Sequence, residues 1–202
     1  MPPLSITRCP WPGIEDPLYA SYHDTEWGVP LTDSQALFEK IVLEGFQAGL
    51  SWLTILRKRE NFRRAFDRFD ANKVAKYKAA DVTRLMSDAG IIRHLAKIEA
   101  TIDNAKAYIT IEKKQSFASF IWNHIDGSPI QNTLTSSRDA PSQTELSKRL
   151  SRALKTEGFR FVGPTTIYAF MQSSGMTNDH LVTCPRHAAC RKLQLTMKGP
   201  IG

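Results

Sequence analysis

The hydrophobic pattern of residues 94 to 112 most constrains how this chain can fold. Apolar residues recur there at steps of three and four, which gives an α-helix one continuous apolar stripe. The stripe consists of Leu95, Ile98, Ile102, Ala105 and Ile109. Nearly every other periodic segment also has helical spacing, and we find neither a convincing alternating strand nor an internal repeat. The sequence therefore predicts an all-α protein.

Short polar residues and glycines mark where helices are expected to begin and end. The residues predicted to cap or start helices are Thr32 or Asp33, Ser51, Asp70, Asp81 and Ser116. Those predicted to end helices are Gly90 and Gly158. The pattern "SQTE" at 142–145 predicts a capping box in which Glu145 reaches back to Ser142. Residues 126–141, rich in Ser, Thr, Asn and Pro, predict a loop.

Composition and charge limit the classes of function. The 202 residues suffice for one well-packed domain or two small ones, and 42% hydrophobic with 23% charged residues is typical of a soluble globular protein. We expect no membrane span and no signal peptide, because apolar runs of the required length and placement are missing. A formal net charge of +7 favours anionic partners, nucleic acid first. Three cysteines, an odd number, indicate a reducing compartment rather than a disulfide framework.

The stretch "EGFQAGLSW" at residues 44–52 places a carboxylate where a helix should face a core. Glu44 follows Ile41 by three residues and Leu37 by seven, so the three side chains share one face. A buried carboxylate is costly unless it is paired or hydrogen-bonded. Two interpretations stay open from the residues alone. Glu44 is either a structural group that accepts backbone amides or pairs with an arginine, or it is a ligand-binding carboxylate.

The segment "LKTEGFRFVGPTTIYAFMQ" at 154–172 predicts two helices joined by a tight turn. A helix stops at Gly158, the turn ends at Gly163, and Pro164 takes the first position of the next helix. Such a hairpin can aim free backbone N–H groups at a phosphate, and Lys155 and Arg160 can add positive charge. An ordinary helical corner has the same pattern and stays an alternative. The basic run "RKRENFRR" is likewise typical of a solvated helix face.

Cysteine and histidine lie near both ends of the chain. His180 and Cys184 are four residues apart, so one helical turn can present both to a metal. Cys9 and His23 are spaced too loosely to be a zinc signature. A competing local group exists in "CPRHAAC", which contains Cys184, His187 and Cys190. Without further information these side chains can also be unrelated, and the aromatic residues of "PLYASYHDTEW" can be ordinary core.

Several motifs together resemble one known family. They are "YHDTEWGVP", "EGFQAGLSW", "KRENFRRAF", "DAGIIRH", "FVGPTTIYAFMQ" and "NDH", and the match extends from about Cys9 to Cys184. They resemble the 3-methyladenine DNA glycosylase I (Tag) family. The resemblance implies an all-α fold of the helix-hairpin-helix DNA glycosylase superfamily. It also implies an enzyme that hydrolyses the N-glycosidic bond of 3-methyladenine in DNA and leaves an abasic site.

The resemblance assigns tasks to individual residues. It implies that Glu44 is the catalytic carboxylate of the base pocket, that Tyr19, Tyr22 and Trp52 bind the base, and that Trp11 and Trp27 lie nearby. The residues implied to contact DNA are Gly49 and Leu50, which resemble the element that enters the base stack, and Gly163, Lys155 and Arg160 of the hairpin. One structural zinc per chain would be held by Cys9, His23, His180 and Cys184, and would join the N- and C-terminal segments.

The superfamily's usual catalytic aspartate follows its hairpin. Asp179 lies near that spacing, 16 residues after Gly163. The Tag branch lacks this aspartate in its normal role, so we do not predict Asp179 as a general base.

The resemblance also sets the expected organisation and partners. We predict one helical glycosylase domain over residues 1–190, which can form two lobes, and a flexible tail over residues 191–202. The expected partners are double-stranded DNA containing alkylated adenine and free 3-methyladenine as the product. We expect a monomer in the cytoplasm or associated with the nucleoid, with no membrane contact. A non-catalytic DNA-binding or damage-sensing homologue is the alternative, and a zinc-stapled helical interaction protein without a DNA role is the weaker third.

Overall fold

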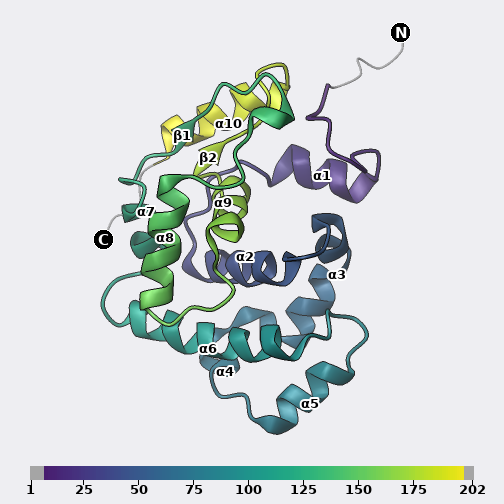
Figure 1. Ribbon diagram of the computed structural model, residues 1–202, viewed down its shortest axis with the longest axis vertical. Helices are drawn as coiled ribbons and strands as arrows, with labels where there is room; N and C mark the ends of the chain where they lie inside the picture. Colours follow the sequence, from purple (N-terminus) through teal and green to yellow (C-terminus); the bar gives the residue numbers. More distant parts are fainter. Residues whose placement is uncertain (1–6, 198–202) are drawn as a thin grey trace.

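The computed structural model describes residues 7 to 197, and in this range the predicted predominance of helices is confirmed (Figure 1). The α-helices are α1 (Pro17–Thr25), α2 (Ser34–Gln47), α3 (Trp52–Ala65), α4 (Ala71–Val74), α5 (Ala79–Ser87), α6 (Leu95–Glu112), α7 (Phe117–Asn123), α8 (Glu145–Thr156), α9 (Pro164–Ser173) and α10 (Pro185–Thr196). Two short 3-10 helices are η1 (Asp67–Phe69) and η2 (Ser137–Asp139). The sequence did not predict two short strands, β1 (Ile130–Gln131) and β2 (Thr177–Asn178), which pair in parallel.

Most predicted helix starts are confirmed by the hydrogen bonds of their caps. The side chain of Asp33 accepts a hydrogen bond from the Ala36 amide at 2.7 Å and starts α2. Ser51, Asp70 and Ser116 cap α3, α4 and α7 in the same way. These caps satisfy N–H groups that the first turn of a helix leaves free.

Three predicted boundaries are wrong. Helix α5 begins at Ala79, and Asp81 accepts a hydrogen bond from the Lys78 amide from inside the first turn instead of capping the helix. Gly90 does not end α5, because the helix stops at Ser87 and the backbone of Gly90 is not left-handed. Thr144 caps α8 through a reciprocal pair with Ser147, so the expected box between residues 142 and 145 does not form. At α5 and α8 a side chain inside the first turn, Asp81 or Ser147, accepts a hydrogen bond from the backbone amide of the residue just before the helix.

Helix α2 lies at the centre of the fold (Figure 1). It contacts α3, α6, α7 and α9. Helices α8 and α9 pack against each other as the predicted hairpin, with Gly158 in the left-handed region at φ +100° just after α8. One cluster of buried hydrophobic residues includes both Cys9 and Cys184, so the core continues from one end of the chain to the other.

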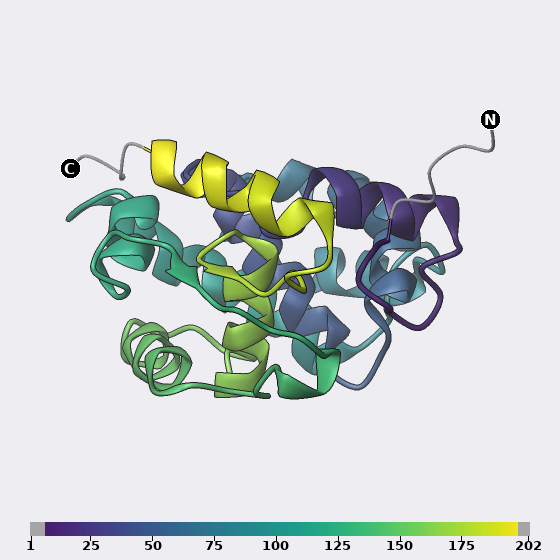
Figure 2. The same ribbon diagram turned by 90° about the horizontal axis from the view of Figure 1, so that it is seen from above.

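The two ends of the described chain meet beside this core. Figure 2 shows the beginning of α10 beside α1 along one side of the molecule. The expected boundary between residues 190 and 191 falls inside α10, which continues to Thr196 and buries Gln194. The amide of Gln194 donates to the backbone carbonyls of Gly28 and Gly175. Residues 198–202 of the expected tail lie outside the described residues.

Gly175 allows the chain to turn sharply between α9 and β2. Its φ is +70°, and a Cβ there would lie 2.4 Å from the backbone nitrogen of Pro30. Any other residue would push these two backbone segments apart. This close approach helps place β2, and the residues that follow it, beside the segment after α1.

No helix of residues 7–197 combines the length and apolar character needed to cross a membrane.

Candidate functional site

A cavity of about 320 Å³ lies between α1, α2, α9 and the beginning of α3. Its walls combine aromatic rings with a few polar groups, a lining typical of small-molecule sites. The aromatic residues are Trp11, Tyr19, Tyr22, Trp27 and Trp52, and the polar ones include Glu44, Gln47, Gln172, Ser173 and Asp179. The structure therefore brings together Glu44 and all three residues expected to bind a base.

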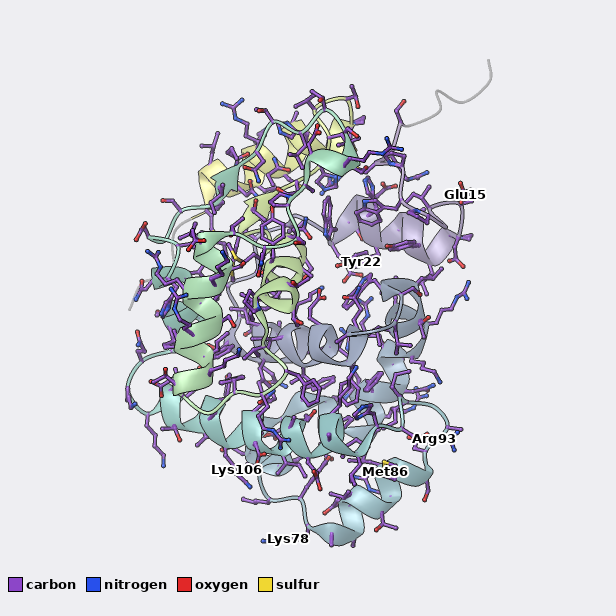
Figure 3. The ribbon with its side chains drawn as sticks, viewed as in Figure 1. Glu15, Tyr22, Lys78, Met86, Arg93 and Lys106 are labelled. Carbon is purple, nitrogen blue, oxygen red and sulfur yellow. The ribbon has the colours of Figure 1, made fainter. Side chains whose placement is uncertain are left out.

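The aromatic walls form one connected group of rings. The rings of Tyr22 and Trp52 lie with their centroids 5.5 Å apart, and those of Trp11 and Tyr19 lie 5.0 Å apart. Trp11 also meets Trp27 edge-on at 4.7 Å. Figure 3 shows Tyr22 on the inner side of α1, toward α2. The indole N–H of Trp52 is buried and has no hydrogen-bond partner among the described residues, which marks it as a donor left for a ligand or water.

Among the described residues, Glu44 is one of two acidic residues that line the cavity, and it is only 3% exposed. One hydrogen bond reaches it, from Ser173 Oγ to Oε1 at 2.8 Å. No arginine or backbone amide of the described residues holds it, contrary to the structural alternative left open by the sequence. A carboxylate that is buried with a single donor keeps hydrogen-bonding capacity for a ligand.

Burial controls the protonation of this carboxyl group. Desolvation raises the pKa of Glu44 to about 7, although the Ser173 hydrogen bond and the positive charge of Lys40 lower it. Burial likewise raises the pKa of the Tyr19 and Tyr22 hydroxyls, with the negative charge of Glu44 as the next cause. The carboxyl group of Glu44 therefore titrates near neutral pH, whereas the two phenols remain neutral hydrogen-bonding groups there.

Asp179 lies in the cavity wall but is fully occupied. Its Oδ1 accepts from Asn132 at 2.6 Å and from Thr177 at 3.0 Å. Its Oδ2 accepts from Tyr168 at 2.6 Å and from Gln172 at 2.7 Å. A carboxylate with four donors is held in place and is poorly suited to remove a proton from water. Asp179 is therefore held in the cavity wall as a hydrogen-bond acceptor for four side chains.

A second group of side chains lies directly behind the cavity. Cys9, His23, His180 and Cys184 are all buried, and their ligand atoms all lie within 4.8 Å of one another. Cys9 Sγ is 3.6 Å from His180 Nδ1, and Cys184 Sγ is 3.7 Å from His23 Nε2. Cys9 and Leu181 also line the cavity, so this cluster and the aromatic walls share residues and neighbours.

The outer nitrogen of each histidine in the cluster has an oxygen partner. His23 Nδ1 lies 2.8 Å from Asp24 Oδ1, and Arg8 in turn pairs with Asp24. His180 Nε2 lies 3.0 Å from the carbonyl oxygen of Trp27. Such partners fix the ring orientation of metal-binding histidines and leave the inner nitrogen available. The hydrogen bond with Cys9 and then the two imidazoles lower the pKa of the Cys184 thiol, which favours the thiolate that a metal needs.

The competing ligands suggested by "CPRHAAC" lie elsewhere. His187 Nε2 is 2.9 Å from the carbonyl oxygen of Asn132. Cys190 is buried against the Trp27 carbonyl and Arg186. Neither residue joins the cluster of four, because α10 turns both side chains toward other partners.

The segment with Gly49 and Leu50 is an exposed turn after α2. Gly49 has φ +85°, and Leu50 is 42% exposed although it is apolar. Lys97 from α6 holds the base of this turn, because its Nζ donates to the carbonyls of Phe46 at 2.9 Å and Ala48 at 2.7 Å. A cation at this place also favours the C-terminal end of α2. The leucine is thus presented at the surface by a turn with a firm base.

The hairpin presents a second exposed element. At Gly163 a Cβ would meet nothing within 4 Å, so packing inside the described chain does not require glycine there. No side chain caps the first turn of α9. Lys155 is exposed, and Arg160 is exposed but pairs with Asp103 at 2.8 Å. The geometry leaves room for a phosphate at Gly163, with less free charge on Arg160 than the sequence suggested.

Two polar neighbours of Glu44 were missed from the sequence. Gln47 follows Glu44 by three residues on α2, so helical spacing alone could have placed it in the cavity. Ser173 lies on α9, 129 residues away, and no local pattern joins it to Glu44.

Comparison with known proteins now gives the family. The profile described as Methyladenine glycosylase matches residues 11–187. The chain belongs to the methyladenine glycosylase family. It is 55% identical over 180 residues to the DNA-3-methyladenine glycosylase of Haemophilus influenzae, covering 89% of this chain and 97% of that protein.

Solved structures of relatives have the same fold. A crystal structure of 3-methyladenine DNA glycosylase I superposes with a TM-score of 0.87 at 50% identity, covering 89% of this chain and 98% of the other. A variant of 3-methyladenine DNA glycosylase I solved in complex with 3-methyladenine superposes with a TM-score of 0.83 at 41% identity, covering 85% and 92%.

The burial of Glu44 predicts a pH-dependent gain of stability in Glu44→Gln. A carboxyl group with a raised pKa binds its proton more tightly in the folded chain, so its ionisation costs stability as pH rises from about 4.5 to about 7. The glutamine has no such loss and can still accept the Ser173 hydrogen bond. We expect similar stabilities near pH 4.5 and an advantage for the variant on the order of 2–3 kcal/mol above pH 7.

Urea unfolding at a series of pH values measures this difference. Glu99→Gln, which changes an exposed glutamate of α6, is the matched control and should follow the wild-type curve. Parallel curves for wild type and Glu44→Gln would contradict the raised pKa.

Proposed function

We propose that this chain is a DNA-3-methyladenine glycosylase, which hydrolyses the N-glycosidic bond of 3-methyladenine in alkylated DNA. The observation that carries the proposal is the Glu44 carboxylate, buried with a single donor in a cavity walled by aromatic rings. The family, and the relatives named for this activity, support the same substrate.

The chemistry of the cavity suits a methylated adenine. Methylation at N3 makes the base cationic while it is attached to the sugar, and aromatic faces attract a cation by about 1–2 kcal/mol in a desolvated site. Tyr19, Tyr22 and Trp52 would supply these faces. Glu44 would accept a hydrogen bond from the exocyclic amine, and its negative charge would favour the cationic base over unmodified adenine.

The same positive charge weakens the bond that must break. The departing 3-methyladenine is neutral and therefore needs little acid catalysis. Binding, orientation and a nearby water would supply most of what the enzyme adds. A strong general base is then unnecessary, which fits an Asp179 whose oxygens are both occupied.

The base must leave the duplex to reach this cavity. Leu50 would fill the space it leaves, because an apolar wedge can enter the base stack where the backbone approaches closely. The N–H groups at the beginning of α9, next to Gly163, would bind a phosphate of the backbone. Lys155 and Arg160 would strengthen this contact without reading the sequence.

We propose zinc for the cluster of two cysteines and two histidines. Two thiolates and two imidazoles form a closed tetrahedral set that suits structural Zn²⁺, and the outer partners of both histidines fit that role. When bound, the metal would join α1 and the segment before it to the segment after β2 and take no part in the reaction. The base cavity would then have one wall held by the metal.

Release of 3-methyladenine from methylated duplex DNA tests the proposed activity. The wild-type protein should release the base, and Glu44→Gln should stay folded but bind and excise it about 10- to 100-fold less well, because a charged hydrogen bond is lost. Glu99→Gln should match wild type, and all three should bind undamaged duplex equally.

A wild-type protein that binds DNA without releasing base would support the non-catalytic homologue instead. Normal excision by a folded Glu44→Gln would return Glu44 to a structural role.

Elemental analysis tests the metal. We expect one zinc per chain in the purified protein and none in a Cys9→Ala, His180→Ala double variant. The double variant should be strongly destabilised, because metal binding is coupled to folding. Cys190→Ala changes a buried cysteine outside the cluster and should keep its zinc. Zinc retention in the double variant, or zinc-free wild type, would contradict the assignment.

Duplex affinity tests the hairpin. Gly163→Val should weaken binding to damaged and undamaged duplex alike by about tenfold or more, since a side chain would keep the backbone away from the phosphate. Its melting temperature should change little, because open space surrounds the position. Lys155→Ala should reduce the slope of log affinity against log salt concentration by about one. Unchanged duplex affinity in both variants would make the hairpin an ordinary corner.

A further inference from the structure

Lys40 is a cation placed directly beside the aromatic walls of the base cavity. It lies one helical turn before Glu44 on α2, so both side chains leave the same side of the helix. Its Nζ is 5.1 Å from the ring centroid of Tyr22 and 5.5 Å from that of Trp52. A positive charge near a pocket for a cationic base needs an explanation, since like charges repel.

The lysine does not open into the base cavity. It lines a second cavity of about 240 Å³, on the side of α3 and the segment after α1, whereas Tyr22 and Trp52 line the first. Ser173 lines both cavities. The two rings therefore separate the ammonium group from a base bound in the first cavity, while Glu44 stands between the two spaces beside Ser173.

The other carboxylates around Lys40 already have cations. Glu26 accepts two hydrogen bonds from Arg59, at 2.6 and 2.9 Å. Glu39 pairs with Arg63 at 2.6 Å. Lys40 itself has no ion pair within 4.0 Å in the described part of the chain. Glu44 is thus the carboxylate near Lys40 whose charge is not neutralised by an arginine.

We propose that Lys40 is a positioning residue that acts through Glu44: its positive charge increases the ionised fraction of the carboxyl group near neutral pH, so that the cavity more often offers a carboxylate to the flipped base. The proposal rests on the proposed function of Glu44 in base binding. It extends that function by naming the group that sets the charge of the pocket.

The titration behaviour of both groups supports this coupling. Burial raises the pKa of Glu44, and Lys40 is the charge that lowers it again. Burial lowers the pKa of Lys40, and Glu44 is the largest influence that raises it. Charges one helical turn apart in a desolvated site interact strongly without touching. Without Lys40, Glu44 would be largely protonated at neutral pH and could no longer attract a cation.

Lys40 also has an unfavourable effect on base binding, which a purely structural residue would not have. Its charge also repels a cationic base through the rings. Near neutral pH, loss of Lys40 would leave Glu44 mostly protonated, so there the lysine strengthens binding of the cationic base. At high pH, where Glu44 is ionised in either case, the lysine weakens it. Removal of Lys40 should therefore weaken base binding near neutral pH and strengthen it at high pH.

Carboxyl NMR of the ligand-free protein is the direct test. The Glu44 signal is identified by its disappearance in Glu44→Gln and titrated in wild type, Lys40→Met and Lys40→Arg. Methionine keeps the unbranched chain without the charge, and arginine keeps the charge. We expect the pKa of Glu44 to rise by about one unit in Lys40→Met and to stay near the wild-type value in Lys40→Arg. Lys73→Met, at an exposed lysine of α4, is the control and should leave it unchanged.

Excision from methylated DNA gives the second measurement. Lys40→Met should be about tenfold slower than wild type near pH 6.5 and equal or faster near pH 8.5. In a Glu44→Gln background, Lys40→Met should no longer shift the pH profile. Lys40→Gln serves in place of Lys40→Met if the methionine variant does not fold.

The outcomes separate this inference from the proposed function. An unchanged pKa of Glu44 in folded Lys40→Met would overturn the inference, as would an equal loss of activity at every pH. A raised pKa with unchanged excision near pH 6.5 would uphold the coupling and instead remove Glu44 from base binding.

Discussion

Burying one carboxylate without a full set of partners is the constraint on which this structure depends. Water solvates an ionised glutamate far better than a protein interior does, so the fold must hold Glu44 against its tendency to take up a proton. The Ser173 hydrogen bond and the charge of Lys40 are what the chain supplies toward that end. Both groups favour the ionised form, yet the pKa of Glu44 remains raised at about 7. The site is thus left ready to gain from a cation, which would stabilise the same ionised form.

To keep Glu44 accessible to a ligand, the aromatic residues that line the cavity must be held in fixed positions. The aromatic residues of the cavity lie on α1, on the short segments that precede and follow it, and at the beginning of α3. The cluster of two cysteines and two histidines connects them to the far end of the chain, since Cys9 and His180 are 171 residues apart in sequence. Trp27 takes part in both regions: its ring meets Trp11 at 4.7 Å, and its carbonyl oxygen holds His180. Trp27 therefore connects the position of the cluster to that of the aromatic cavity walls.

The sequence was sufficient for features with a local cause. Helix periods, the caps at Asp33 and Ser51 and the hairpin at Gly163 depend on neighbours within a few residues, and the structure has them where they were predicted. The position of Glu44 on an apolar face follows from the same spacing. Two helix starts were misplaced, because Asp81 accepts from the Lys78 amide inside the first turn of α5, and Thr144 rather than Ser142 caps α8.

Features with a long-range cause were not available from the residues alone. The spacing of Cys9 and His23 carries no metal signature, and only the family resemblance joined them to His180 and Cys184 before the structure placed all four within 4.8 Å. Ser173 reaches Glu44 across 129 residues, and Lys40 became notable only when its Nζ was found beside the rings of Tyr22 and Trp52. The carboxylate could be found from its helix, but the groups that set its charge belong to the packing of several helices. Function at this site therefore depends on contacts that form only when α1, α2, α3 and α9 have packed together, and the properties of Glu44 belong to that assembly.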